Sequence, residues 1–156
     1  MNTVRERIPE MLAPAPVPQG EPERAGPIRM SCVIPCRNEA RNLDLLLPQL
    51  CDLLPRLAEA WEVILVDDGS TDHTATVMRD WSELPGFRVL ELSRNFGKEA
   101  ALTAGLEAAA GDVVVMMDAD LQHPPALVSE MLGHWRRGAR RRPRRSPPAS
   151  ARPARE

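Results

Sequence analysis

The feature that most constrains the fold is a run of five apolar residues, 113–117, which leads directly into Asp118 and Asp120. Gly111 and Asp112 precede the run, and two prolines close the segment at 124–125. A continuous apolar run of this length predicts a strand buried on both faces, as found in parallel sheets that lie beneath helices. Ligands of open α/β sheets bind outside the carboxyl ends of the strands, so the acidic pair is predicted to lie at a ligand site.

Asp118 and Asp120 are separated by a single residue. In an extended chain, side chains at this spacing point the same way and lie roughly 6 to 7 Å apart, because a strand rises about 3.3 Å per residue. Two such carboxylates can share one hard cation or the waters bound to it. Neither would be expected to be buried without such a partner. The pair therefore predicts a cation site.

Strand and helix patterns alternate four times along the chain. Apolar runs predict strands at 28–35, 61–66, 87–92 and 113–117. Leucines recur at helical spacing after the first strand, and helical patterns also cover 72–84, the segment after Lys98 and the segment after the two prolines. The third helix has a small inner face made of Ala101, Ala104, Gly105 and Ala108, and the fourth an apolar face made of Leu127, Val128, Met131, Leu132 and Trp135. This alternation predicts a parallel α/β sheet with right-handed crossovers.

Single residues predict how the first two helices begin and bend. Asn38 is expected to cap the first helix, and the turn at Asp72 is expected to cap the second. Pro48 is expected to kink or split the first helix, because proline lacks the backbone N–H of a helical hydrogen bond and its ring clashes with the preceding turn.

The two ends of the chain differ in composition from its centre. Residues 1–27 contain six prolines among Ala, Glu and Arg, which predicts a disordered tail that cannot bury a core. Residues 138–156 consist almost entirely of Arg, Pro, Ser and Ala, and predict a second disordered tail. A truncated or frame-shifted product is the favoured explanation of the second tail, and a basic tail that touches anionic lipid is the alternative. A single domain is thus expected at 28–137.

The charge distribution argues against binding of nucleic acid. Residues 1–135 contain 11 Lys and Arg against 21 Asp and Glu, whereas residues 136–156 contain nine Arg and one Glu. The predicted domain is therefore acidic, and domains that bind nucleic acid present a basic face to the phosphates.

Cysteine content and hydropathy bear on the cellular compartment. The cysteines, Cys32, Cys36 and Cys51, are odd in number and are predicted to be free thiols in a reducing compartment rather than a disulfide or a zinc site. The sequence has neither a run of 18 apolar residues nor an apolar signal core. A cytoplasmic location is expected, either free or at the cytoplasmic face of a membrane.

Acidic residues follow three of the predicted strands: Glu39, Asp67 with Asp68, and Asp118 with Asp120. Each alone is also explained as a helix cap or a solvated residue. Two common nucleotide-binding motifs, G-x-G-x-x-G and G-x-x-x-x-G-K-[ST], do not occur. A phosphorylated receiver domain is disfavoured as well, because its acidic pair follows the first strand and its lysine follows the last.

Four segments, at 33–39, 66–72, 93–98 and 118–125, resemble in order and spacing the motifs of the inverting family 2 glycosyltransferases of GT-A fold. Within that family they look most like the dolichyl- and polyprenyl-phosphate sugar transferases. The resemblance covers about residues 29–137, the N-terminal portion of such an enzyme. Arg37 departs from it, because many relatives have an aromatic residue there that helps to hold the base; the guanidinium plane could take over that stacking.

The resemblance implies a site for a nucleotide sugar, with a UDP- or GDP-sugar as donor. The residues it assigns to the nucleotide are Pro35, Arg37, Glu39, Val66, Asp67, Asp68, Lys98 and Ala119. It makes Asp118 and Asp120 the catalytic residues, and these two with Gln122 the ligands of Mg²⁺ or Mn²⁺. Lys98 could reach a phosphate or simply be a solvated loop residue, and His123 is more simply explained as a turn residue than as a ligand.

The resemblance further implies transfer of a hexose, with inversion, to a polyprenyl or dolichyl phosphate. Such an acceptor needs no general base, because a phosphate monoester is already ionised at pH 7. Full-length relatives act at a membrane surface, and their acceptor region lies beyond residue 135. The chain is therefore expected to be truncated, prone to aggregation and poorly active. The alternative is a module that binds nucleotide sugar or metal without catalysis.

Overall fold

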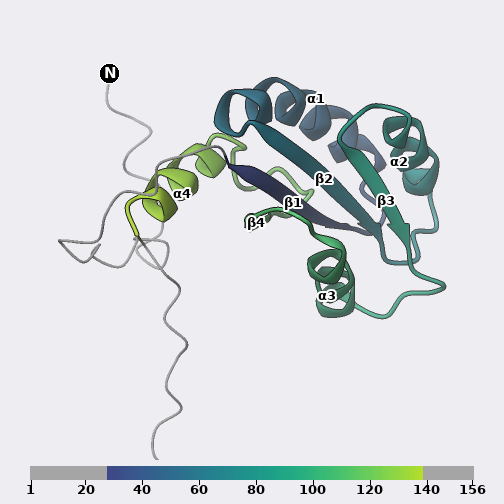
Figure 1. Cartoon of the computed structure of the whole chain (residues 1–156). Helices are drawn as coiled ribbons and strands as arrows, with labels where there is room; N and C mark the ends of the chain where they lie inside the picture. The colour runs from purple at the N-terminus through teal and green to yellow at the C-terminus, as the bar shows by residue number, and fades with distance from the viewer. Residues whose placement is uncertain (1–27, 139–156) are drawn as a thin grey trace, which may run out of the picture.

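The computed structural model describes residues 28–138, which form a four-stranded parallel sheet with helices on both faces (Figure 1). The order of the strands is β3-β2-β1-β4. The strands are β1 (Arg29–Cys36), β2 (Ala60–Asp67), β3 (Phe87–Glu91) and β4 (Val113–Met116). The helices are α1 (Ala40–Leu57), α2 (Thr74–Ser82), α3 (Lys98–Ala108) and α4 (Leu127–Arg136). The predicted parallel α/β sheet is confirmed, while the predicted tails at 1–27 and 138–156 lie, apart from Gly138, outside the described residues.

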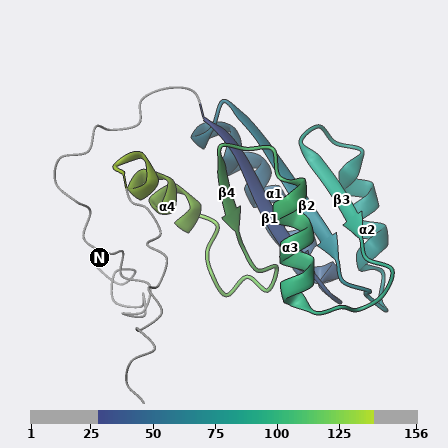
Figure 2. The ribbon, with the colours of Figure 1, turned by 60° about the horizontal axis from the view of Figure 1, so that its bottom comes forward.

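Two apolar cores lie on the two sides of the sheet. Among the described helices, α1 and α2 cover one face, and α3 covers the other (Figures 1 and 2). The larger core, on the α1 side, includes Leu43, Leu46, Leu47, Leu50, Leu54, Cys32, Ile34, Val63, Leu65 and Met78. The smaller one joins Ala101 of α3 to Val33, Ile64 and Val66 of the sheet. The small inner face predicted for α3 is confirmed by this close packing.

Strand β4 differs from its prediction. It is an edge strand of the described sheet, paired with β1 only. Val115 is buried, but Val114 is 36% exposed and Met116 is 45% exposed, so the strand is not buried on both faces. The physical reason is the position of α3, which packs mainly on β1 and β2 and leaves that side of β4 uncovered.

The first helix starts and continues differently from expectation. Asn38 does not cap α1: its φ is 55°, and its side-chain oxygen accepts hydrogen bonds from the backbone N–H groups of Thr71 (2.8 Å) and Asp72 (3.3 Å). Nor does Pro48 split the helix, which is continuous from Ala40 to Leu57. Pro48 lies on the exposed side, where water can satisfy the carbonyl group that loses its helical partner.

Two further helix starts lie later in the chain than predicted. Helix α2 begins at Thr74, because the Asp72 carboxylate accepts the backbone N–H of Thr74 (2.9 Å) and closes a local turn before the helix. Helix α4 begins at Leu127, and the prolines form the preceding turn, with the Pro125 carbonyl accepting the N–H of Val128. Met131 of α4 is exposed rather than part of the buried face. No helix among residues 28–138 has the length and apolar character needed to cross a membrane.

Candidate functional site

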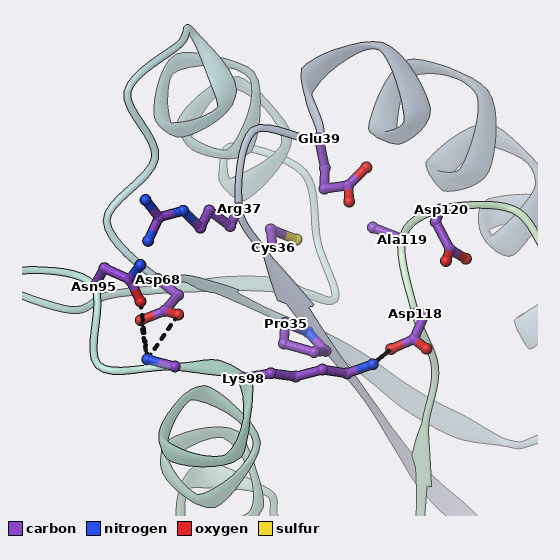
Figure 3. Close-up of a pocket in the computed structure, with 11 residues that line it drawn as sticks. Pro35, Cys36, Arg37, Glu39, Asp68, Asn95, Lys98, Asp118, Ala119 and Asp120 are labelled. Atoms are coloured by element: carbon purple, nitrogen blue, oxygen red, sulfur yellow. Dashed lines mark hydrogen bonds and ion pairs between the residues drawn. The ribbon is translucent and has the colours of Figure 1, made fainter.

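A pocket of about 350 Å³ lies at the carboxyl ends of the strands, where the sequence places the acidic loops (Figure 3). Its volume is within the range of sites for small molecules. All four strands or the loops after them contribute: Pro35, Cys36, Arg37 and Glu39 from β1, Asp68 from β2, Asn95, Gly97 and Lys98 from β3, and Asp118, Ala119 and Asp120 from β4. Four segments distant in sequence thus meet at one edge of the sheet.

Most of the residues predicted for the site line this pocket. Those that do are Pro35, Arg37, Glu39, Asp68, Lys98, Asp118, Ala119 and Asp120. Val66, Asp67 and Gln122 do not. Val66 is buried in the core beneath α3, and the buried Asp67 accepts the backbone N–H of Ser70 (3.2 Å). Gln122 is exposed, and its backbone N–H donates to the Asp120 carboxylate (3.1 Å).

Three pocket residues, Cys36, Asn95 and Gly97, were not among the predicted site residues. All three lie inside segments that carry the motif resemblance, so loop position was a usable signal. Side-chain chemistry alone did not single them out. Gly97 has a φ of 100°, a conformation that residues with a Cβ atom rarely adopt.

Asp68 holds one wall of the pocket together. The residue is 4% exposed, and its carboxylate accepts hydrogen bonds from the backbone N–H groups of Phe96 (2.8 Å) and Gly97 (3.0 Å). The side chain of Asn95 accepts the same Gly97 N–H (2.9 Å). This carboxylate therefore fixes the loop that leads into α3.

Gly69 allows the loops after β2 and β3 to come together. Its φ is 69°, and an added Cβ would lie 2.5 Å from the backbone nitrogen of Asn95. A side chain at this position would separate the two loops and pull the Asp68 carboxylate away from Gly97.

Asp118 lies two residues beyond the end of β4, and Ala119 and Asp120 lie in the turn that follows. Leu121, which follows them, has a φ of 60°, so the chain changes direction directly after the acidic pair. The Asp118 carboxylate forms an ion pair with Lys98, whose Nζ lies 2.5 Å from its Oδ1. In Figure 3 the Lys98 side chain extends along one side of the pocket to reach it.

The oxygen atoms that line the pocket suit a hard cation that also binds oxygen atoms of a ligand. Among residues 28–138, no group of three or more Asp, Glu, His or Cys side chains is placed to hold a metal ion. Two carboxylates, Asp118 and Asp120, line one side of the pocket. Mg²⁺ is commonly bound in this way, by one or two carboxylates together with substrate phosphates and water.

The other side chains of the pocket differ in charge and in partners. Burial raises the pKa of the Cys36 thiol, and the nearby charges of Glu39 and Asp67 raise it further, so this thiol is no nucleophile near pH 7. Glu39 accepts the side-chain N–H of Asn42 (2.6 Å). Arg37 is exposed and points toward Asn95, on the side of the pocket away from Asp118 (Figure 3).

The three cysteines are free, as predicted. Cys32 and Cys36 are buried, and burial raises the pKa of Cys32 to about 12. Both pack in the larger apolar core.

Comparison with known proteins gives a family match over residues 31–141, to the model described as glycosyl transferase family 2. An uncharacterized glycosyltransferase of Synechocystis, sll0501, is 44% identical over 112 residues, which are 71% of this chain and 35% of that protein. The undecaprenyl-phosphate 4-deoxy-4-formamido-L-arabinose transferase of Aeromonas hydrophila is 40% identical over 105 residues, covering 66% of this chain and 32% of its own length. The chain thus spans about a third of the length of these curated relatives.

Solved structures of similar fold include two sugar transferases. The mannosyltransferase of Pyrobaculum calidifontis, in complex with GDP-Man and Mn²⁺, has a TM-score of 0.60 and 28% identity over 73% of this chain and 34% of its own. Glucosyl-3-phosphoglycerate synthase of Mycobacterium tuberculosis has a TM-score of 0.56 and 30% identity over 68% of this chain and 40% of its own.

Proposed function

Because this chain belongs to glycosyl transferase family 2, we propose that its pocket binds a nucleoside diphosphate sugar and a divalent cation for inverting transfer to a polyprenyl phosphate. The GT-A-like fold expected from the sequence is confirmed by its structural neighbours. The observation that carries the proposal is the meeting of Asp118 and Asp120 with two basic side chains, Arg37 and Lys98, in one pocket. Carboxylates for a cation and basic groups for phosphates are the requirements of a diphosphate site.

The choice of sugar donor is supported by the neighbours. The Pyrobaculum mannosyltransferase was solved with GDP-Man and Mn²⁺, and the mycobacterial synthase with UDP and Mn²⁺. In this chain the base and ribose would lie toward Arg37 and Glu39, at the end of β1, where the exposed guanidinium plane can stack on a base. The diphosphate would then lie between Lys98 and the two aspartates.

Asp118 and Asp120 would hold the cation, Mg²⁺ or Mn²⁺, with Gln122 as a third oxygen ligand after a change in the exposed turn that carries it. When bound, the cation neutralises negative charge on the departing nucleoside diphosphate. Lys98 would add a positive charge to the same group. Buried Asp68 would act indirectly. Its carboxylate accepts hydrogen bonds from the backbone of the loop that leads to Lys98.

The acceptor in this proposal is a lipid phosphate, as named for the relative from Aeromonas. A phosphate oxygen attacks the anomeric carbon, a new C–O bond forms, and the bond to the diphosphate breaks with its electron pair leaving on the nucleoside diphosphate. Attack from the face opposite the diphosphate inverts the configuration. The acceptor phosphate is already ionised at pH 7, so this chain needs to supply no general base.

Calorimetric titration with UDP- and GDP-sugars, with and without Mn²⁺, tests the binding part of the proposal. We expect one of the two nucleotide classes to bind only with Mn²⁺, and Asp118→Asn to weaken that binding by about tenfold or more, because an anionic oxygen ligand is removed. Asp52→Asn, on the exposed side of α1 and toward the end of the helix away from Glu39, removes the same charge outside the pocket and should bind like the parent. Equal binding by Asp118→Asn and the parent would show that the pair is no metal site.

A transfer assay separates the enzyme from the alternative, a module that binds without catalysis. The chain is incubated with the labelled nucleotide sugar that binds, Mn²⁺ and a short polyprenyl phosphate, and the lipid fraction is analysed. Labelled glycolipid of inverted configuration supports the transferase. Tight binding of the sugar donor without labelled glycolipid is the result expected of the binding module.

A further inference from the structure

The ion pair between Lys98 and Asp118 places a positive group where a cation ligand is proposed. Nζ of Lys98 lies 2.5 Å from Oδ1 of Asp118, so one oxygen of that carboxylate is already engaged by a cationic group of the chain itself. Two carboxylates that are close in sequence, Asp118 and Asp120, repel each other, and a lysine charge between α3 and the β4 loop offsets that repulsion (Figure 3).

The position of Lys98 in α3 gives no local reason for this contact. It is the first residue of the helix, and a positive charge at a helix N-terminus is disfavoured by the helix dipole. A lysine there that turned to solvent would satisfy its charge equally well. Its side chain instead extends along one side of the pocket to the loop after β4, so the Asp118 charge is what holds it there.

The pair is exposed enough to exchange partners. The Lys98 side chain is 59% exposed and that of Asp118 is 38% exposed, so water can solvate either group when the pair opens. Exposed ion pairs of this kind are weak. The backbone of the loop is meanwhile held by Asp68 and Asn95 through the Gly97 N–H. Exchange would therefore need rotation of the lysine side chain only.

We propose that Lys98 is a displaceable counter-ion, which occupies Asp118 in the ligand-free pocket and moves to the diphosphate when a divalent cation takes Asp118. This inference rests on the proposed function and deepens it. The cation alone must expel the lysine without giving it a new partner, whereas the cation with a diphosphate supplies both. Lys98 thus makes the pocket take up cation and diphosphate together, and it disfavours either one alone.

Calorimetry on Lys98→Gln tests the exchange, because two affinities should change in opposite directions. Titrated with Mn²⁺ alone, the variant should bind roughly threefold to tenfold more tightly than the parent, since the competing charge is gone. Titrated with UDP or GDP in excess Mn²⁺, it should bind more weakly by a similar factor, since the phosphates lose a partner. Lys98→Arg keeps the charge and should keep the low affinity for Mn²⁺ alone.

Arg56→Gln is the matched control, because it removes one positive charge at the other end of α1, away from the pocket. It should change neither affinity. A double variant, Lys98→Gln with Asp118→Asn, should lose the gain in Mn²⁺ affinity, because the carboxylate that Lys98 protects is absent.

The outcomes separate this inference from the proposed function. A gain in Mn²⁺ affinity without any nucleotide binding would support the competition of Lys98 with the cation for Asp118, but it would contradict the nucleotide-sugar site and with it the move of Lys98 to a diphosphate. Nucleotide binding by the parent together with unchanged or weakened Mn²⁺ affinity in Lys98→Gln would support the site and overturn the exchange. Loss of both affinities to the same degree would show a merely structural lysine and would also overturn it.

Discussion

At the scale of single residues, the acids of the pocket divide into those whose oxygens are available to a ligand and those that hold loops. Asp120 is exposed, and Asp118 can exchange its lysine. Asp68 is different, because both of its oxygens accept backbone N–H groups from the loop after β3. A carboxylate bound in this way contributes to the site through the loop that it holds.

The Asp68→Asn variant tests this division. The amide group keeps the shape of the side chain but replaces one acceptor oxygen with an NH₂ group. That NH₂ group then faces a backbone N–H, so two donors meet and a buried donor is left without an acceptor. We expect a loss of about 1 to 3 kcal/mol in the free energy of unfolding, measured by urea denaturation. Asp44→Asn, on the exposed side of α1, is the control, and its free energy of unfolding should change by no more than about 0.5 kcal/mol. Full stability of Asp68→Asn with loss of nucleotide binding would instead make Asp68 a direct ligand.

The sequence predicted which acids gather at the strand ends, but not what each one binds. Asp67 and Asp68 follow the same strand and were assigned the same role, yet Asp67 bonds to its own turn and Asp68 to a distant loop. The difference arises because the loop at 93–97 packs against Asp68. The local pattern of residues around Asp67 and Asp68 carries no information about that contact. Asn38 was misassigned for the same reason, since its partners lie more than thirty positions away.

At the scale of elements, the position of α3 depends on one glycine. An added Cβ at Gly105 would lie 2.3 Å from Cγ1 of Val33 and 3.2 Å from Cγ2 of Val66. The helix therefore lies closer to β1 and β2 than any side chain at this position would allow, and its N-terminus carries Lys98 to the pocket.

Gly105→Ala should accordingly destabilise the fold although alanine favours helices. Overpacking against Val33 is expected to cost about 1 to 3 kcal/mol, more than the gain in helix propensity. Gly133→Ala in α4 is the matched control: its nearest neighbour is the flexible end of Arg137 at 3.4 Å, so it should be neutral or stabilising by up to about 1 kcal/mol. Thermal unfolding of both variants checks the pair, and equal shifts would contradict the close packing of α3.

Element order and type were predictable from the sequence, because each apolar run or helical repeat is a local signal. The environment of an element was not. The run at 113–117 has the composition of a central strand, but β4 is an edge strand with Val114 and Met116 exposed. A pattern of apolar residues shows that a strand can be buried on both faces, and only the positions of neighbouring elements decide whether it is.

At the scale of the whole molecule, Glu62 of β2 links β1, β3 and the segment between α3 and β4. It lies at the amino ends of the strands, opposite the pocket. Its carboxylate accepts the Ser31 hydroxyl (2.6 Å), the Ala110 N–H (2.8 Å) and the Arg88 guanidinium (2.8 Å). Burial acts to raise the pKa of Glu62, but these hydrogen bonds outweigh it and the pKa is lowered. The ionised form is therefore favoured in the folded chain.

The pH dependence follows from the sign of that shift. Because the pKa of Glu62 is lower in the folded chain than in the unfolded chain, its ionisation stabilises the fold at any pH above the pKa of the unfolded chain. This stability is lost as the pH falls through the pKa of the folded chain. Glu62→Gln should thus be less stable than the parent by about 1 to 2 kcal/mol at pH 7, and the difference should shrink as the pH falls below about 4.5. Urea denaturation at pH 7, 5 and 3.5 measures it. A difference that stayed constant across this range would contradict the role of the charge.

The sugar donor and the cation are proposed to bind at the carboxyl ends of the strands, and one NMR measurement tests this proposal directly. Amide signals of the 156-residue chain are followed with the nucleotide sugar and Mg²⁺, and Mg²⁺ is then replaced by paramagnetic Mn²⁺. Broadening falls steeply with distance, and the eight residues of β2 separate the two edges by about 25 Å. We predict broadening centred on Gly97 and Ala119, with Ala60 and Gly111 at the opposite edge unaffected. Broadening centred on Ala60 and Gly111, or spread evenly over the chain, would contradict the account.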